Sequence, residues 1–213
     1  MKKPQTLDTE KILKKLLSEK ILIMDGAMGT MIQQHNLSEK DYRGSKFIDF
    51  SSPKGERELF VKGNNELLNI TQPELIQKIH EDYFAAGADI IETNTFGANS
   101  IAQDDYYMAD LVYEMNINAA KFAKLAAKKF STPEKPRFVA GAIGPTPKTA
   151  SISPDVNDPG ARNINFDQLV ESYKEQTQAL IEGGVDIILV ETVFDTLNCK
   201  AALCAIQSIF DKQ

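Results

Sequence analysis

Four short apolar runs lead directly into polar residues, and each is followed by a stretch with helical spacing. The apolar runs predict buried strands over residues 21–24, 89–93, 137–143 and 186–190. Apolar residues at three- and four-residue spacing predict helices over residues 9–20, 73–86, 106–130, 166–182 and 195–210. Alternating strands and helices of this kind build a parallel sheet that helices cover.

Two of these segments are nearly copies of each other. AGADIIET occupies residues 86–93, and GGVDIILVET occupies residues 183–192. The similarity predicts repeated βα units with insertions, which suit either an open parallel sheet or a (β/α)₈ barrel. A barrel needs eight strands and about 250 residues. With four predicted strands in 213 residues, a barrel of this kind would be represented by its first four βα units, a half barrel.

Acidic residues stand where three of the predicted strands end. Asp25, Glu92 and Glu191 would therefore share one rim, because the carboxyl ends of parallel strands meet at the same edge. Carboxylates that converge with few cations nearby suit the ammonium group of a small ligand. In the alternative, Asp25 only caps the next turn, and either glutamate pairs with a lysine or arginine. Four further rim residues are expected: Thr93, Asn94, Thr146 and Thr192.

The turn after Asp25 adds a second kind of contact. Gly26 and Gly29 leave the backbone uncovered, so a ligand can approach the amides closely. An acid beside bare amides predicts a pocket for a zwitterion, with the ammonium at the carboxylate and the carboxylate at the amides. The segment 31–72 is rich in turn formers and is longer than an ordinary connection between a strand and a helix. Its length and position predict a loop that covers this pocket. Residues 1–20 are expected to be a frayed polar start and an N-terminal helix.

The composition of the chain excludes some classes of binding partner. The net charge of −6 argues against nucleic acid and anionic membranes, and no apolar run approaches the roughly 20 residues of a membrane span. The lysines within 11–20 and 121–129 are interpreted as solvated helix faces. Two cysteines in a chain this long indicate a reducing, cytoplasmic setting. Cys199 and Cys204 point in different directions from one helix, so both are predicted to be small buried residues rather than metal ligands.

Four motifs give a more specific indication. MDGAMGT at 24–30, DIIETNTF at 89–96, SISPDVNDP at 151–159 and VETVFDT at 190–196 resemble the homocysteine S-methyltransferase family. The resemblance extends from about residue 10 to the end of the chain. Within the family, the stretch 151–159 and KGNN at 62–65 are most similar to the homocysteine-binding module of the cobalamin-dependent methionine synthase branch.

The resemblance implies a zinc-containing (β/α)₈ barrel in which the homocysteine thiolate accepts a methyl group. In this branch methylcobalamin carries the methyl group, and methyltetrahydrofolate replenishes it. Asp25 and Glu191 would hold the homocysteine ammonium by this resemblance. The homocysteine carboxylate would lie on the amides of the turn, which is formed by Gly26, Ala27, Met28, Gly29 and Thr30.

The resemblance also marks a departure. The family's three zinc cysteines lie in the second half of the barrel, so they are expected beyond Gln213, and no bound metal or cobalamin is expected here. One hypothesis is that residues 1–213 are the N-terminal part of a methyltransferase barrel, inactive alone. The others are a non-catalytic half barrel that self-associates or complements a separate second half, and a cobalamin-independent enzyme with another methyl donor.

Overall fold

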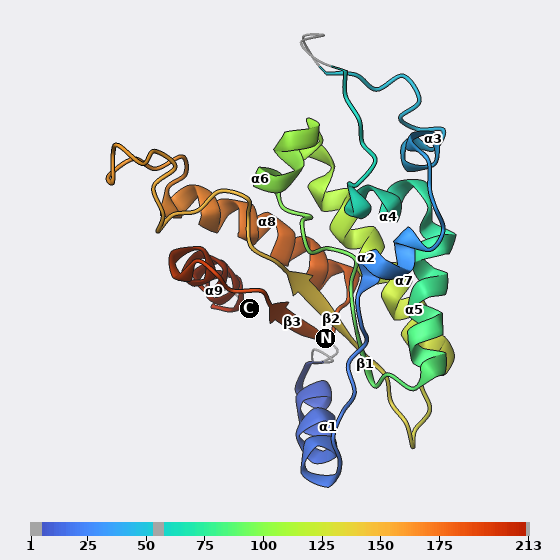
Figure 1. The fold of residues 1–213 in the computed structure, drawn as a ribbon. Helices are drawn as coiled ribbons and strands as arrows, with labels where there is room; N and C mark the ends of the chain where they lie inside the picture. Colours follow the sequence, from blue (N-terminus) through green and yellow to red (C-terminus); the bar gives the residue numbers. More distant parts are fainter. Residues whose placement is uncertain (1–5, 53–57, 212–213) are drawn as a thin grey trace.

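The computed structural model describes residues 6–52 and 58–211 and has a small parallel sheet among many helices (Figure 1). The strands are β1 (Ile90–Glu92), β2 (Phe138–Ile143) and β3 (Ile187–Val190). The helices are α1 (Thr6–Glu19), α2 (Met28–Gln33), α3 (Glu39–Arg43), α4 (Leu68–Thr71), α5 (Pro73–Ala86), α6 (Ser100–Gln103), α7 (Val112–Phe130), α8 (Phe166–Gly183) and α9 (Thr196–Phe210). Short 3₁₀ turns lie at Asn65–Leu67, Asp104–Tyr106 and Ala109–Leu111.

The sheet has the order β1-β2-β3, with both pairs parallel. Successive long helices pack on one another alongside the sheet, α5 on α7, α7 on α8 and α8 on α9 (Figure 1). This arrangement confirms an α/β fold with parallel strands. The structure describes three strands, so it does not itself show the expected half barrel.

The first predicted strand is the exception. Residues 21–24 lie beside β1 and form one isolated parallel bridge, between Met24 and Ile90. The prediction that this run is buried was wrong, because Ile21 is 84% exposed and Ile23 is 55% exposed. No described element covers their side chains, although the backbone of Ile23 accepts bonds from Asp89 and Ile90 at 2.7 and 3.1 Å.

The near-copies mark the starts of two strands. Gly87 and Gly184 end α5 and α8 in the left-handed conformation, which glycine adopts without a steric penalty. Two residues later, Asp89 accepts a bond from the Ile23 amide at 3.1 Å, and Asp186 accepts one from the Val139 amide at 2.9 Å. The repeated acids therefore fasten neighbouring strands at the edge of the sheet opposite the acidic strand ends.

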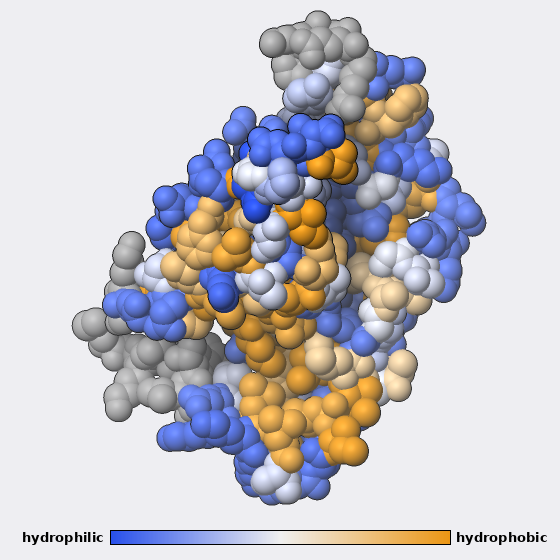
Figure 2. Space-filling model, turned by 60° about the vertical axis from the view of Figure 1, so that its left-hand side comes forward, coloured by the Kyte–Doolittle hydropathy of each residue, from blue (hydrophilic) through white to orange (hydrophobic). Residues whose placement is uncertain are grey.

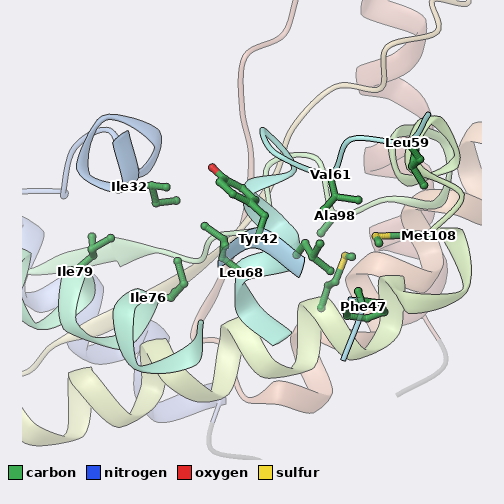
Figure 3. Close-up of a cluster of buried hydrophobic side chains, with 12 residues drawn as sticks. Ile32, Tyr42, Phe47, Leu59, Val61, Leu68, Ile76, Ile79, Ala98 and Met108 are labelled. Carbon is green, nitrogen blue, oxygen red and sulfur yellow. The ribbon is translucent and has the colours of Figure 1, made fainter. Parts of the chain in front are cut away.

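Part of the predicted covering loop, residues 53–57, lies outside the described residues. Its described parts, 31–52 and 58–72, contain α3, α4 and a 3₁₀ turn. The Arg43 guanidinium donates to the carbonyls of Phe47 and Phe50, while Glu39 accepts from the amides of Val61 and Lys62. Figure 3 shows the apolar cluster beneath, in which side chains of this segment meet α5 and Met108. These contacts hold the segment against α5, which itself packs beside the sheet.

Helix ends also differ from the predictions. The helix expected from residue 9 begins at Thr6, and the one expected from residue 106 begins as α7 at Val112 after two 3₁₀ turns. Asp195 caps α9 and accepts bonds from the amides of Ala150 and Ser151, so it joins the 151–160 loop to β3. Among the described residues, no helix combines the length and apolar character needed to cross a membrane.

Candidate functional site

A pocket of about 510 Å³ lies where residues 25–29, the end of β1 and the end of β3 meet. Asp25, Glu92 and Glu191 all line it, so the acids of three separate sequence segments share one cavity. The returning segment 31–72 supplies the remaining wall through Asn65 and Glu66.

Asp25 is fixed by the strand beside it. The Glu92 amide shares its N–H between the two oxygens of the Asp25 carboxylate, each 3.1 Å away, and the Asp25 amide donates to the Ile90 carbonyl. Burial raises the pKa of Asp25 to about 7, and the charges of Glu92 and Glu191 add to this, while the bond from the Glu92 amide opposes it. Near neutral pH the Asp25 carboxyl is therefore poised between its protonated and ionised forms.

The other acids of the pocket are perturbed in the same direction. Burial raises the pKa of Glu92, and the neighbouring Glu191 raises it further. Burial also raises the pKa of Glu191 and of Glu66, although Glu66 accepts a 2.8 Å bond from the Gly97 amide. No lysine, arginine or histidine lines the pocket within the part of the chain that the structure describes. A cation that entered would meet four carboxyl groups without a protein counter-charge.

The turn after Asp25 contains glycine at positions 26 and 29 for reasons other than backbone conformation. Neither Gly26 nor Gly29 has a positive φ. A Cβ on Gly26 would lie 3.3 Å from the Tyr83 hydroxyl oxygen, which donates to the Ala27 carbonyl. Glycine at position 26 therefore serves close packing, whereas a Cβ on Gly29 would make an ordinary contact of 3.6 Å with the Asn65 side chain. Both glycines leave the backbone uncovered beside the pocket. The turn leads into α2, whose first N–H groups have no acceptor within the helix.

Thr93 and Asn94 line the pocket, but their polar groups are used in its walls. The Thr93 hydroxyl accepts from the Ala142 amide at 3.0 Å and contacts the Thr95 hydroxyl. The Asn94 amide group donates to the Asn65 carbonyl at 2.8 Å. These bonds position the β1 end and the returning segment relative to each other.

Three expected contacts do not line this pocket. Thr30 is exposed. Thr192, whose backbone has a φ of +52°, lines a separate small cavity. Thr146 is buried and donates to the Lys148 carbonyl, because the chain turns away from the rim after β2. Four lining residues were not predicted as site residues: Asn65, Glu66, Thr95 and Phe96. Thr95 and Phe96 come three and four residues after the end of β1, so a strand-end rule extended by two residues could have included them.

The described residues do not fit a metal centre. They contain no group of three or more histidine, cysteine, aspartate or glutamate side chains arranged to hold a metal ion. Cys204 is exposed and Cys199 is half-buried, so the prediction that both are buried was wrong. His35 is exposed, whereas His80 is fully buried in α5, which lowers its pKa to about 4.

Two comparisons relate the chain to known proteins. A family model described as homocysteine S-methyltransferase matches residues 22–212. Among solved structures, the homocysteine methyltransferase MmuM from Escherichia coli is similar in its metallated form, with a TM-score of 0.68 and 19% identity, covering 93% of this chain and 63% of that one. Its oxidised form gives a TM-score of 0.69 at 19% identity, covering 93% and 62%. The chain thus spans less than two thirds of these relatives.

Proposed function

Because this chain belongs to the homocysteine S-methyltransferase family, we propose that its acidic pocket binds the amino-acid end of homocysteine within a methyltransferase. Asp25 and Glu191 hold the ammonium group, with Glu92 beside them. The carboxylate lies on the turn amides of residues 26–29, the part of the turn that lines the pocket. The observation that carries the proposal is the convergence of four carboxyl groups on one cavity of about 510 Å³, which is large enough for an amino acid and has no cationic side chain among its described lining residues.

The proposed reaction transfers a methyl group to the homocysteine sulfur. In the family a zinc ion favours the thiolate, which is the nucleophilic form of a thiol. The described residues hold no fitting cluster, so we assign this chain the recognition of the amino acid and derive no step at a metal. We propose that residues 1–213 form the N-terminal part of the barrel domain. The parallel strands, which are adjacent in the sheet in the same order as in the sequence, support this proposal.

The methyl donor is a finer part of the proposal. We favour methylcobalamin, replenished from methyltetrahydrofolate by other modules, because the motifs at 62–65 and 151–159 resemble that branch. Residues 62–66 also lead into the pocket wall. A cobalamin-independent enzyme with another methyl donor is the alternative.

Titration calorimetry with homocysteine and with 4-mercaptobutanoate, which lacks the amino group, tests the assignment. A charge-assisted hydrogen bond contributes about 1.5–3 kcal/mol, so the analogue should bind at least about tenfold more weakly. The 2-hydroxy analogue of homocysteine, in which a neutral hydroxyl of similar size replaces the ammonium group, should be weakened similarly. Equal affinities for the three compounds would show that the pocket does not recognise an ammonium group.

Homocysteine binding should strengthen as the pH rises through about 7. The ammonium needs ionised carboxylates, whereas the Asp25 carboxyl, with its pKa raised to about 7, holds a proton below that pH. The dissociation constant should therefore increase by up to about tenfold for each unit of pH lost below 7, if one proton is displaced. Titrations between pH 5.5 and 7.5 measure this, and a constant affinity across that range would contradict the expectation.

A second proposal concerns self-association. Figure 2, in which the α8 and α9 side comes forward, shows a broad hydrophobic area. Leu203 and Phe210 of α9 are 53% and 49% exposed, and their seven-residue spacing places them on one helix face. A contiguous apolar area of this kind favours association with a second copy.

Replacing Leu203 and Phe210 together by Glu should shift the chain toward monomer, because charged side chains would have to be buried in the interface. Sedimentation velocity at micromolar concentration measures the shift. The control replaces Ile152 and Val156, two exposed residues of the 151–160 loop, by Glu. A monomeric parent chain, or an equal effect of the control, would refute self-association through α9.

A further inference from the structure

A second pocket, of about 730 Å³, lies away from the acidic one and shares no lining residue with it. Its lining is basic and partly apolar: Lys121, Lys124, Leu125, Ala127, Lys128, Ser131, Arg137 and Gly183. No acidic side chain lines it in the described ranges 6–52 and 58–211. In a chain with a net charge of −6, this is a local reversal of sign.

One wall of this pocket is formed by side chains that lie along one face of the helix α7. Lys121, Lys124, Leu125 and Lys128 follow the spacing i, i+3, i+4 and i+7, which places their side chains along one stripe. At about 1.5 Å per residue, the two outer lysines are separated by roughly 10 Å along the helix. The side chain between them, Leu125, is 52% exposed. The wall therefore presents two cationic ends and an apolar middle.

The opposite wall is built by the end of α8 and the start of β2. A Cβ on Gly183 would overlap the Ala120 side chain, so glycine allows α8 to approach α7 closely at the pocket. Arg137, immediately before β2, is buried, and its guanidinium donates to the carbonyls of Gly87 and Ala88. This wall is thus fixed by backbone contacts.

The charges within the pocket are only partly balanced. Lys124 donates to both oxygens of Asp186 at 2.7 Å, and Arg137 lies 3.6 Å from Asp89. Lys121 and Lys128 have no ion pair with any described residue, and the buried Nε of Arg137 has no hydrogen-bond partner there. The outer two lysines consequently remain available to an anion, whereas the paired lysine between them contributes little net charge.

We propose that this pocket binds a small organic dianion whose two acidic groups are separated by a hydrocarbon segment. The acidic groups pair with Lys121 and Lys128, and the hydrocarbon segment packs on Leu125. The cavity distinguishes this face from a simple solvated helix surface, because the α8 end and Arg137 enclose the lysines on a second side. The proposal does not depend on homocysteine binding in the acidic pocket.

Suberate, an eight-carbon dicarboxylate, is a suitable probe. Titration of the 213-residue chain, followed by amide chemical shifts, should show saturable changes at residues 121–137. Octanoate, with one carboxylate, should bind at least threefold more weakly, and uncharged 1,8-octanediol should not saturate. Absence of a saturable change with suberate, or equal binding of the diol, would overturn the proposal.

A matched pair of variants separates a site from general attraction to positive charge. Replacing Lys121 and Lys128 together by Gln should weaken suberate binding at least tenfold. Replacing Lys11 and Lys200 by Gln removes the same charge from exposed positions on α1 and α9 and should change the affinity less than twofold. Equal losses in the two double variants would mean that the face attracts anions without forming a site, which contradicts the proposal.

Discussion

Replacing Asp25 by Asn is expected to weaken homocysteine binding by about 10- to 150-fold. The change removes one negative charge and leaves the shape of the side chain, so it reports the charge-assisted bond, worth about 1.5–3 kcal/mol. Glu191→Gln should have an effect in the same range, because both side chains line the same cavity. Titration calorimetry at pH 7.5, where the Asp25 carboxyl is mostly ionised, measures both variants.

The urea stability of the Asp25→Asn variant shows whether weaker binding comes from the lost charge or from a damaged fold. An asparagine side-chain oxygen can still accept a bond from the Glu92 amide, and the loss of a carboxylate relieves repulsion with Glu92 and Glu191. Asp25→Asn should therefore unfold at the same urea concentration as the parent chain, or a higher one. Glu134→Gln, at an exposed loop position, should change neither property. Unchanged homocysteine affinity in both pocket variants would refute the assignment of the ammonium site.

Gly144→Ala is expected to destabilise the chain by about 3 kcal/mol, the upper part of the range for overpacking a core. Gly144 is buried directly after β2, and a Cβ there would lie 2.6 Å from the Phe96 carbonyl oxygen and 2.7 Å from its ring. A backbone oxygen cannot move aside as a flexible side chain can, so residue 96 must shift. Phe96 lines the acidic pocket, and homocysteine binding should weaken together with the stability.

Urea unfolding compares this variant with Gly160→Ala. A Cβ on Gly160 would meet only the end of the Asp158 side chain at 3.3 Å, in an exposed loop. That control should change the free energy of unfolding by less than about 0.5 kcal/mol, as surface substitutions usually do. If Gly144→Ala were as stable as the control, the close approach of β2 and Phe96 would not exist in solution.

The strand ends were accessible from the sequence because the rule behind them is local. An apolar run that leads into Glu92 or Glu191 predicts both the strand and the direction in which the acid faces. The same rule placed Asp25 on the rim, although the run before it forms only one bridge and is exposed. Periodicity identifies apolar side chains, but it does not show what covers them.

The wall from residues 31–72 depends on contacts that no local pattern encodes. Asn65 reaches the pocket because the Tyr42 hydroxyl donates to its side chain and the Asn94 amide group donates to its carbonyl. Glu66 is held by the Gly97 amide. These partners are 23 to 31 residues away in the chain, so the placement follows from tertiary packing. Thr146 shows the converse, since a strand-end position was insufficient to bring it to the pocket.

A crystal structure of the chain with homocysteine would show which end of the ligand meets the acids of the pocket. We expect the ligand's ammonium nitrogen at roughly 3 Å from the carboxylates of Asp25 and Glu191, within charge-assisted hydrogen-bond distance. The ligand's carboxylate should then face the amides of residues 26–29. Homocysteine bound with its carboxylate toward these acids, or bound outside the pocket, would contradict the account.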